Sequence, residues 1–191
     1  MIDKKQHYEI VLKEITRHLE DSETSKLAHW TAGAVYEKRH KFYLGLPTTI
    51  ISLLLAWLLS TQFTQSGLNE KLGSTVIVYI SVFFSLLVSV LSGLLTFLNF
   101  NDLAIKHRTA AENYHALWRD CKNWETDFPD ESKLSQAVQM AQQYRRRIND
   151  INRDSPQIPK WAWKSVQEQI AEGSTTYDSL PAETATNQLD E

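Results

Sequence analysis

The sequence has little of what catalytic and ligand sites are commonly built from. Its 191 residues include a single cysteine, Cys121, and only six glycines. One thiol excludes an intramolecular disulfide and any Cys-x-x-Cys metal or redox motif. So few glycines leave no Gly-rich loop to hold a phosphate, and no His-Glu-x-x-His pattern occurs. We therefore expect no enzyme, no cofactor and no bound metal.

Charge is also missing from two long stretches. Residues 42–69 and 72–101 contain no Asp, Glu, Lys or Arg. A bilayer core of about 30 Å requires about 20 apolar residues of helix, so these stretches predict membrane spans at residues 42–63 and 76–100, joined by a short outer loop at residues 64–75. The alternative is a pair of buried helices in a soluble protein. Such helices seldom exceed about 14 uncharged residues, and the chain has little other apolar sequence to cover them.

The charges next to the spans predict their orientation. Lys38, Arg39 and Lys41 precede the first span, Lys106 and Arg108 follow the second, and Lys71 is the single basic residue of the loop between them. Basic residues favour the cytoplasmic side, so both termini should be cytoplasmic in a multi-pass protein of the inner (cytoplasmic) membrane. Residues 1–41 are charged throughout, and we expect no cleaved signal peptide. A net charge of -3 indicates no nucleic-acid partner.

The polar segments have helical periodicity. We expect two cytosolic helices in residues 1–41, interrupted at residues 21–25, and a kink or restart at Pro47 inside the first span. The second span should continue unbroken into cytosolic helices over residues 101–172, with Asp130 or Ser132 as a cap. The acidic tail at residues 173–191 should be disordered. The predicted fold is all-α: a two-pass transmembrane helical hairpin with a cytosolic helical bundle built from the N- and C-terminal segments.

Small residues recur every four positions in both spans. The first stripe is Thr48, Ser52, Ala56 and Ser60, and the second is Ser81, Ser85, Ser89 and Gly93. Lipid supplies no hydrophobic drive for helix pairing, so small residues that permit close approach are a main source of packing. The two stripes either join the hairpin to itself, or at least one packs against another copy or lines a pore. The sequence leaves both readings open.

A heptad pattern follows the second span. Its residues are spaced by alternating steps of four and three, which is typical of a coiled-coil seam: Leu103, His107, Ala110, Tyr114, Leu117, Cys121 and Trp124. We take Leu103, Ala110, Tyr114, Leu117, Cys121 and Trp124 as candidates for a cytosolic seam between copies. Cys121 on this seam is more simply read as a buried, inert thiol.

Two further patterns have ordinary explanations. His7, His18, His29 and His40 are 11 residues apart, so neighbours on one helix would be about 16 Å apart, too far to share a metal. Arg145, Arg146 and Arg147 form the tightest basic cluster. They are consistent with an anionic ligand, but also with a solvated helix end paired with Asp150 and Asp154.

Two segments next to the spans resemble a known family. They read WTAGAVYEKRHKFY from Trp30 and NFNDLAIKHRTAAENYHALWRDCKNW from Asn99. Together with the two-pass topology, the sequences Arg39-His40-Lys41 and His107-Arg108-Thr109-Ala110-Ala111 resemble the SLATT family of bacterial two-transmembrane effector domains. The resemblance implies a membrane-disrupting or pore-forming effector of antiphage defence that acts by growth arrest or death of the infected cell. It also implies a sensor partner, such as one from a nucleotidyltransferase system.

Two functions are therefore expected from the sequence. The first is a homo-oligomer that forms a pore or permeabilises the membrane. The alternative is a passive scaffold that recruits partner proteins to the membrane through the cytosolic bundle. Neither span contains a charged residue, which argues against a proton relay or an ion-coupled transporter.

Overall fold

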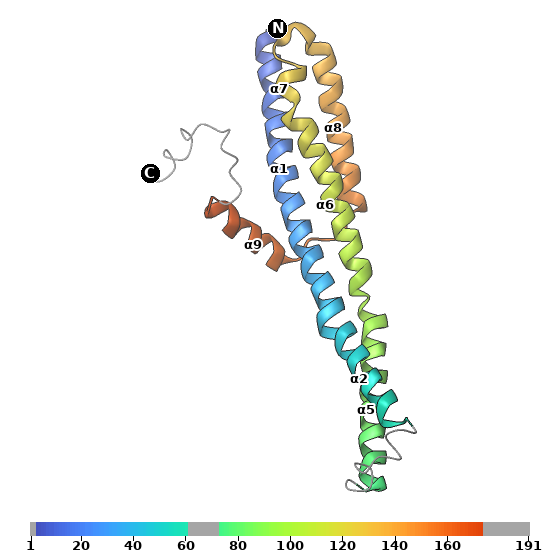
Figure 1. Ribbon diagram of the computed structural model, residues 1–191. Helices are drawn as coiled ribbons and strands as arrows, with labels where there is room; N and C mark the ends of the chain where they lie inside the picture. The colour runs from blue at the N-terminus through green and yellow to red at the C-terminus, as the bar shows by residue number, and fades with distance from the viewer. Residues whose placement is uncertain (1–2, 61–72, 174–191) are drawn as a thin grey trace. The chain divides into compact units, whose positions relative to one another are not determined.

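The computed structural model describes residues 3–60 and 73–173. Every regular element in these two ranges is helical, which confirms the all-α prediction. In chain order (Figure 1) they are α1 (Lys4–Lys38), the π-helix η1 (Arg39–Gly45), α2 (Leu46–Leu58), α5 (Ser74–Leu98), α6 (Phe100–Lys122), α7 (Trp124–Asp127), the 3₁₀-helix η2 (Glu131–Lys133), α8 (Leu134–Asp154) and α9 (Lys160–Ala171). Most of the predicted outer loop and nearly all of the acidic tail lie outside the described residues.

The chain divides into two compact units. Unit 1 combines Met1–Thr31 with Ala110–Glu191, and unit 2 is Ala32–Thr109. Unit 2 therefore holds both apolar runs, and unit 1 holds the amphipathic helices from the two ends of the chain.

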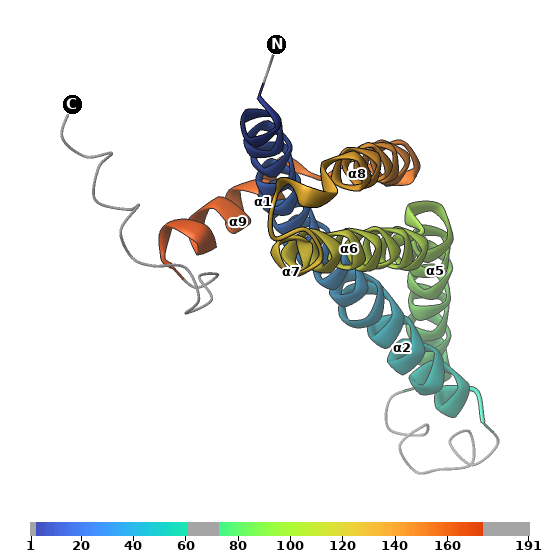
Figure 2. The same cartoon turned by 90° about the horizontal axis from the view of Figure 1, so that it is seen from above.

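The core of unit 1 is formed by α1, α6 and α8, whose unit 1 portions lie side by side in Figures 1 and 2. Val11 and Ile15 of α1 pack in one cluster with Leu117 of α6 and Trp124 of α7. From α8 the cluster receives Ala137, Ala141, Ile148 and Ile151. These residues recur at helical spacing on each element, so one stripe per helix faces the core and each buried large side chain stabilises the unit by about 1.5–3 kcal/mol.

Helix α1 is continuous through residues 21–25, where the sequence predicted an interruption. The hydroxyl of Thr24 donates to the carbonyl of Glu20, four residues earlier, at 2.9 Å. Ser22 is fully buried. Hydroxyl side chains can end a helix by competing for its backbone groups, or they can bond back to the preceding turn and leave it intact. Thr24 bonds back to the preceding turn and leaves the helix intact, and the packing of α1 in unit 1 also stabilises it.

The side-chain cap that the sequence predicts at Asp130 or Ser132 is formed by Asp130. Asp130 accepts a hydrogen bond from the backbone N–H of Ser132 at 2.8 Å and caps η2, which leads into α8. Helix α8 ends before Pro156, and α9 begins directly after Pro159. Ala162 and Val166 of α9 have no exposed surface, so α9 is packed within unit 1.

Helical geometry in unit 2 changes at two points. The first is Pro47, at the start of α2, and it is preceded by the π-helix η1, as the expected restart requires. Proline lacks an N–H and its ring clashes with the carbonyl four residues earlier, and a π-turn accommodates that clash. The second is Asn99, whose φ of 42° places it in the left-handed region between α5 and α6. The prediction that the second span continues unbroken is therefore wrong. Asn99 adopts the left-handed conformation, which asparagine tolerates better than most residues other than glycine, and it separates α5 from α6.

Candidate functional site

Two helical stretches are long and apolar enough to cross a membrane. One ends with α2 and the other begins with α5, as the sequence predicted. In the most apolar 18-residue segment of each stretch, 0% of the residues are buried in the first stretch and 11% in the second. A core helix of a soluble protein would have most of this surface covered. In the described part of the chain, these stretches leave it open.

The uncovered surface carries large apolar side chains. On α2, Leu53 is 66% exposed, and on α5, Phe83 and Phe97 are 61% and 85% exposed. Contiguous apolar surface of this kind on a protein in water marks a membrane or protein interaction site. Water-facing helices normally carry charge, whereas α2 and α5 carry none.

The two small-residue stripes occupy different environments. On α2, which packs against α5, Thr48 and Ser52 are partly buried and Ala56 is exposed; Ser60, just after the end of α2, is partly buried. On α5, Ser81 is partly buried, but Ser85, Ser89 and Gly93 are exposed. The side of α5 that includes Ile77, Phe84, Leu87, Val88, Leu91 and Leu95 is the more covered one. In this chain most of the α2 stripe is partly covered and most of the α5 stripe is open.

Three hydroxyl groups of the stripes, those of Thr48, Ser52 and Ser89, bond back to carbonyls of their own helical segments. Ser52 donates to the carbonyl of Thr48 at 2.8 Å, and Ser89 donates to that of Ser85 at 2.9 Å. These two bonds lie within a helix and do not join α2 to α5, which also pack through apolar side chains. A shallow groove of about 280 Å³ lies between α2 and α5, lined by Leu55, Leu59, Ser81, Val82, Ser85 and Leu86.

Two glycines of unit 2, Gly93 and Gly33, differ in how much space surrounds them. A Cβ atom built on Gly93 would have no atom within 4 Å, so a side chain there meets open space. A Cβ built on Gly33 would lie 3.3 Å from the carbonyl oxygen of Ala104 and 3.6 Å from the amide nitrogen of Arg108. Gly33 therefore sits where the backbones of α1 and α6 approach each other within unit 2.

The predicted seam of α6 and α7 fills the chain's own core. Ala110, Tyr114, Leu117, Cys121 and Trp124 are each at most 4% exposed in unit 1. Leu103, in unit 2, is partly buried. The sequence gave these six residues as candidates for contacts between copies, and within one copy α1 and α8 pack around the five in unit 1.

Aromatic rings and charges flank the apolar helices in unit 2. Tyr36 of α1 stacks on Phe100 with ring centres 5.8 Å apart and on His107 with ring centres 5.5 Å apart. Arg39 lies 5.8 Å from the Tyr36 ring centre. His107 is 1% exposed, and its burial lowers its pKa from the usual 6.5.

Glu37 is a residue that the sequence reasoning missed. Its carboxylate contacts Arg108 of α6 and Lys41 of η1, each at 2.5 Å, and the hydrogen bond from Lys41 together with the charge of Arg108 lowers its pKa. Lys106 similarly pairs with Asp102 at 2.8 Å. The spacing of Glu37 and Lys41, four residues apart on a helix, was the available signal; the contact with Arg108 depends on the fold.

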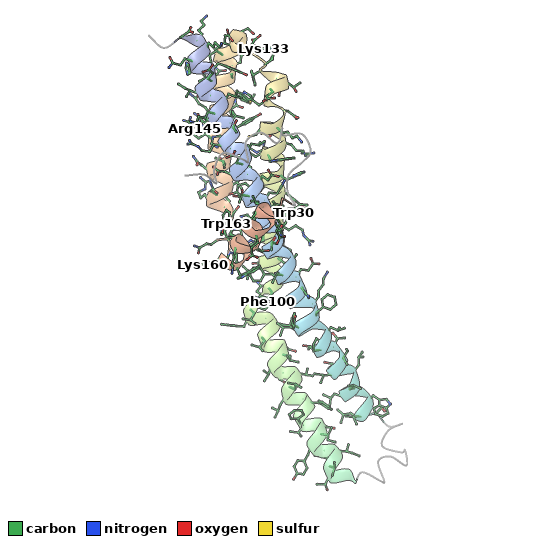
Figure 3. The ribbon with its side chains drawn as sticks, turned by 90° about the vertical axis from the view of Figure 1, so that its left-hand side faces the viewer. Trp30, Phe100, Lys133, Arg145, Lys160 and Trp163 are labelled. Atoms are coloured by element: carbon green, nitrogen blue, oxygen red, sulfur yellow. The ribbon has the colours of Figure 1, made fainter. Side chains whose placement is uncertain are left out.

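The arginine cluster has structural partners. Arg145, labelled in Figure 3, holds Glu14 of α1 through both its Nε and a terminal nitrogen, at 2.6–2.8 Å. Arg147 holds Asp120 of α6 at 2.5 Å. These partners lie on neighbouring helices, whereas the sequence suggested Asp150 and Asp154, which pair instead with Arg153.

The remaining chemical candidates are buried or scattered. Cys121 is 4% exposed, and burial raises the pKa of its thiol to about 12. His29 is 1% exposed and stacks on Tyr114. Over residues 3–60 and 73–173, no three His, Cys, Asp or Glu side chains are grouped to hold a metal ion.

Comparison of the chain with protein-family models, with curated proteins and with solved structures finds no match. Functional inference therefore rests on the residues and their arrangement.

Proposed function

We propose that the chain is a membrane effector whose α2 and α5 cross the bilayer and whose copies associate to permeabilise it. The observation that carries this proposal is the uncovered apolar surface of α2 and α5, which only lipid or another apolar helix can cover without cost. A helix also satisfies its own backbone hydrogen bonds, as a membrane span must.

The proposed orientation places both termini in the cytoplasm. Lys38, Arg39 and Lys41 precede α2, and Lys106 and Arg108 follow α5. Glu37 and Asp102 neutralise part of this charge, but the basic residues remain in excess at this end of the hairpin. The described part of the opposite end, Leu59, Ser60 and Gly73, carries no charge, which supports the cytoplasmic assignment of the basic end.

Self-association is assigned to the open face of α5. Ser85, Ser89 and Gly93 are exposed, and Gly93 has room for an approaching helix. Two helices enclose no lumen, so permeation requires several hairpins or a disrupted bilayer. The absence of charged side chains in α2 and α5 favours a pore lined by hydroxyl groups over an ion-coupled transporter.

The biological role follows the resemblance to SLATT effectors and is proposed on that basis. Opening the cytoplasmic membrane of an infected cell would dissipate its potential and stop growth before phage release. A sensor protein would control that opening, with unit 1 as its contact.

The experiment is controlled expression in bacteria with a potential-sensitive dye. We expect depolarisation soon after induction, together with higher-order species when the protein is cross-linked in membranes. Fully polarised cells containing the intact, membrane-inserted protein would contradict the effector proposal. If such cells also recruited partner proteins through unit 1, the passive scaffold would be the better description.

A further inference from the structure

Trp118 of α6 is surrounded by basic side chains in unit 1. The ammonium group of Lys26 on α1 lies 4.1 Å from the centre of its ring, and that of Lys122 lies 5.1 Å away. The imidazole of His115 stacks on the same indole, with ring centres 5.6 Å apart and planes 16° apart. Trp118 itself is 7% exposed. Lys26 is covered to nearly the same extent at 8% exposure, His115 is partly buried, and Lys122 is exposed.

Lys26 is an unusual lysine for its burial. It is only 8% exposed, and its ammonium group is paired with the Trp118 ring by a cation–π contact at 4.1 Å rather than with a carboxylate. Within residues 3–60 and 73–173, no carboxylate forms an ion pair with Lys26, and the same is true of the exposed Arg119. Other basic residues of unit 1, such as Arg145 and Lys164, do have a carboxylate partner.

The basic groups are close enough to affect one another. Burial lowers the pKa of Lys26; Glu23 opposes this change and Lys122 adds to it. Burial also lowers the pKa of His115, and the positive charges of Lys26 and Arg119 lower it further. Glu23 is the acid that acts on Lys26 from its own helix. The cluster thus brings positive charge from α1 and α6 together around the Trp118 ring.

We propose that Lys26, Arg119 and Lys122 form a binding site for a phosphate group, with His115 as an additional hydrogen-bond donor. A phosphate dianion accepts several charge-assisted hydrogen bonds and would offset the repulsion among these groups. Arginine contacts phosphate through its planar fork and lysine through a point charge, so the set provides both modes. Because Trp118 is covered, the site recognises the phosphate and offers no open ring on which a base would stack.

The phosphate can belong to a soluble compound or to a lipid headgroup, and the site does not depend on the proposed membrane activity. Both sources are tested with the full chain in nanodiscs. In zwitterionic phosphatidylcholine discs, inorganic pyrophosphate is titrated by calorimetry while the His115 ring resonances are followed by NMR. In discs that contain phosphatidylglycerol, the same resonances are followed without pyrophosphate.

We expect saturable binding in one of these arms, with a shift of the His115 resonances. Lys26→Met and Lys122→Met should each weaken that binding about tenfold, the factor that corresponds to one charge-assisted hydrogen bond. Lys164→Met on α9 is the matched control, since this lysine pairs with Glu168 away from the cluster, and its binding should equal that of the unmodified chain.

Absence of saturable binding in both arms would overturn the proposal. Equal binding by the unmodified chain, Lys26→Met and Lys122→Met would also overturn it, because the anion would then be held elsewhere. Circular dichroism checks that each variant folds. If Lys26→Met is unfolded, the exposed positions decide the outcome through Lys122→Met and Arg119→Gln, whose changes remove no buried side chain.

Discussion

Gly33 lies directly against the backbone of Ala104. A Cβ atom at position 33 would be 3.3 Å from the Ala104 carbonyl oxygen, a contact closer than ordinary van der Waals packing. Within unit 2 this is where α1 comes close to the backbone of α6, with the Cβ of His107 also 3.6 Å from that position. Ala32 is fully buried and Ala104 is 7% exposed, so small residues continue the close approach.

Replacing Gly33 should therefore separate these helices. We expect Gly33→Leu to destabilise unit 2 by about 1–3 kcal/mol, since the added atoms meet backbone that has little room to move. Thermal unfolding in detergent, followed by circular dichroism, measures the change. Gly33→Ala is the graded control and should cost less. Equal melting temperatures for all three proteins would contradict the close approach.

Gly93 should behave in the opposite way. Because a Cβ there meets no atom within 4 Å, Gly93→Leu should leave the unfolding of the single chain unchanged. If copies pack through this face, the same substitution should abolish higher-order cross-linked species and depolarisation of expressing cells. Leu94→Phe adds bulk one residue further on, about 100° around the helix, and should preserve both. Normal depolarisation by Gly93→Leu would exclude this face as the contact.

Arg145 and Arg146 offer a matched pair on α8. Arg145→Ala removes the contact with Glu14 and should destabilise unit 1 by about 0.5–1 kcal/mol, a small value because Arg145 is 55% exposed. Arg146→Ala should have almost no effect. Partial burial of Glu14 would raise its pKa, but the Arg145 and His18 contacts lower it overall.

The same contact has a pH dependence. Because the pKa of Glu14 is lowered in the folded state, its contribution is present above the unfolded carboxyl value and is lost as pH falls through the folded value. The difference in stability between the unmodified chain and Arg145→Ala should therefore decrease as pH falls below the usual carboxyl pKa of 4.5 and disappear below the lowered pKa of Glu14. Urea unfolding across this range measures it. A difference that stays constant down to acid pH would show that the ion pair is not its source.

His107 should make unit 2 sensitive to mild acid. Its pKa is lowered by burial, so below 6.5 the unfolded chain binds a proton that the folded chain does not, and stability falls as pH decreases toward the folded value. His107→Phe keeps a ring against Tyr36 without a titrating group and should reduce this dependence. Hydrogen exchange at the amides around Tyr36 provides the measurement. His115→Phe, in unit 1, is the control and should leave the exchange near Tyr36 unchanged.

Cys121 should be inert in the folded protein. It is 4% exposed, and a pKa of about 12 leaves almost no thiolate at neutral pH. A maleimide reagent should label it only after denaturation. In the variant Lys164→Cys, where the native lysine side chain is 78% exposed, the new thiol should react at once. Rapid labelling of native Cys121 would show that the helices around it open readily.

Several features of the fold followed from local sequence. The cap at Asp130 and the restart at Pro47 depend on neighbouring residues, and the structure has both. The two local errors, at residues 21–25 and at Asn99, have a common cause. Hydroxyl and amide side chains can be accommodated inside a helix or can end it, and the packing of the surrounding helix determines which of the two occurs.

The sequence by itself determined that this chain is helical and contains two uncharged, apolar stretches of membrane length, because helical periodicity and lack of charge are properties of consecutive residues. Only the tertiary structure decided which side chains are exposed and which pair. Most of the α5 stripe is exposed, the predicted seam around Leu117 is buried, and Glu37 pairs with Arg108 and Glu14 with Arg145. Those partners are 71 and 131 positions apart, and at such separations no local pattern specifies which side chains meet.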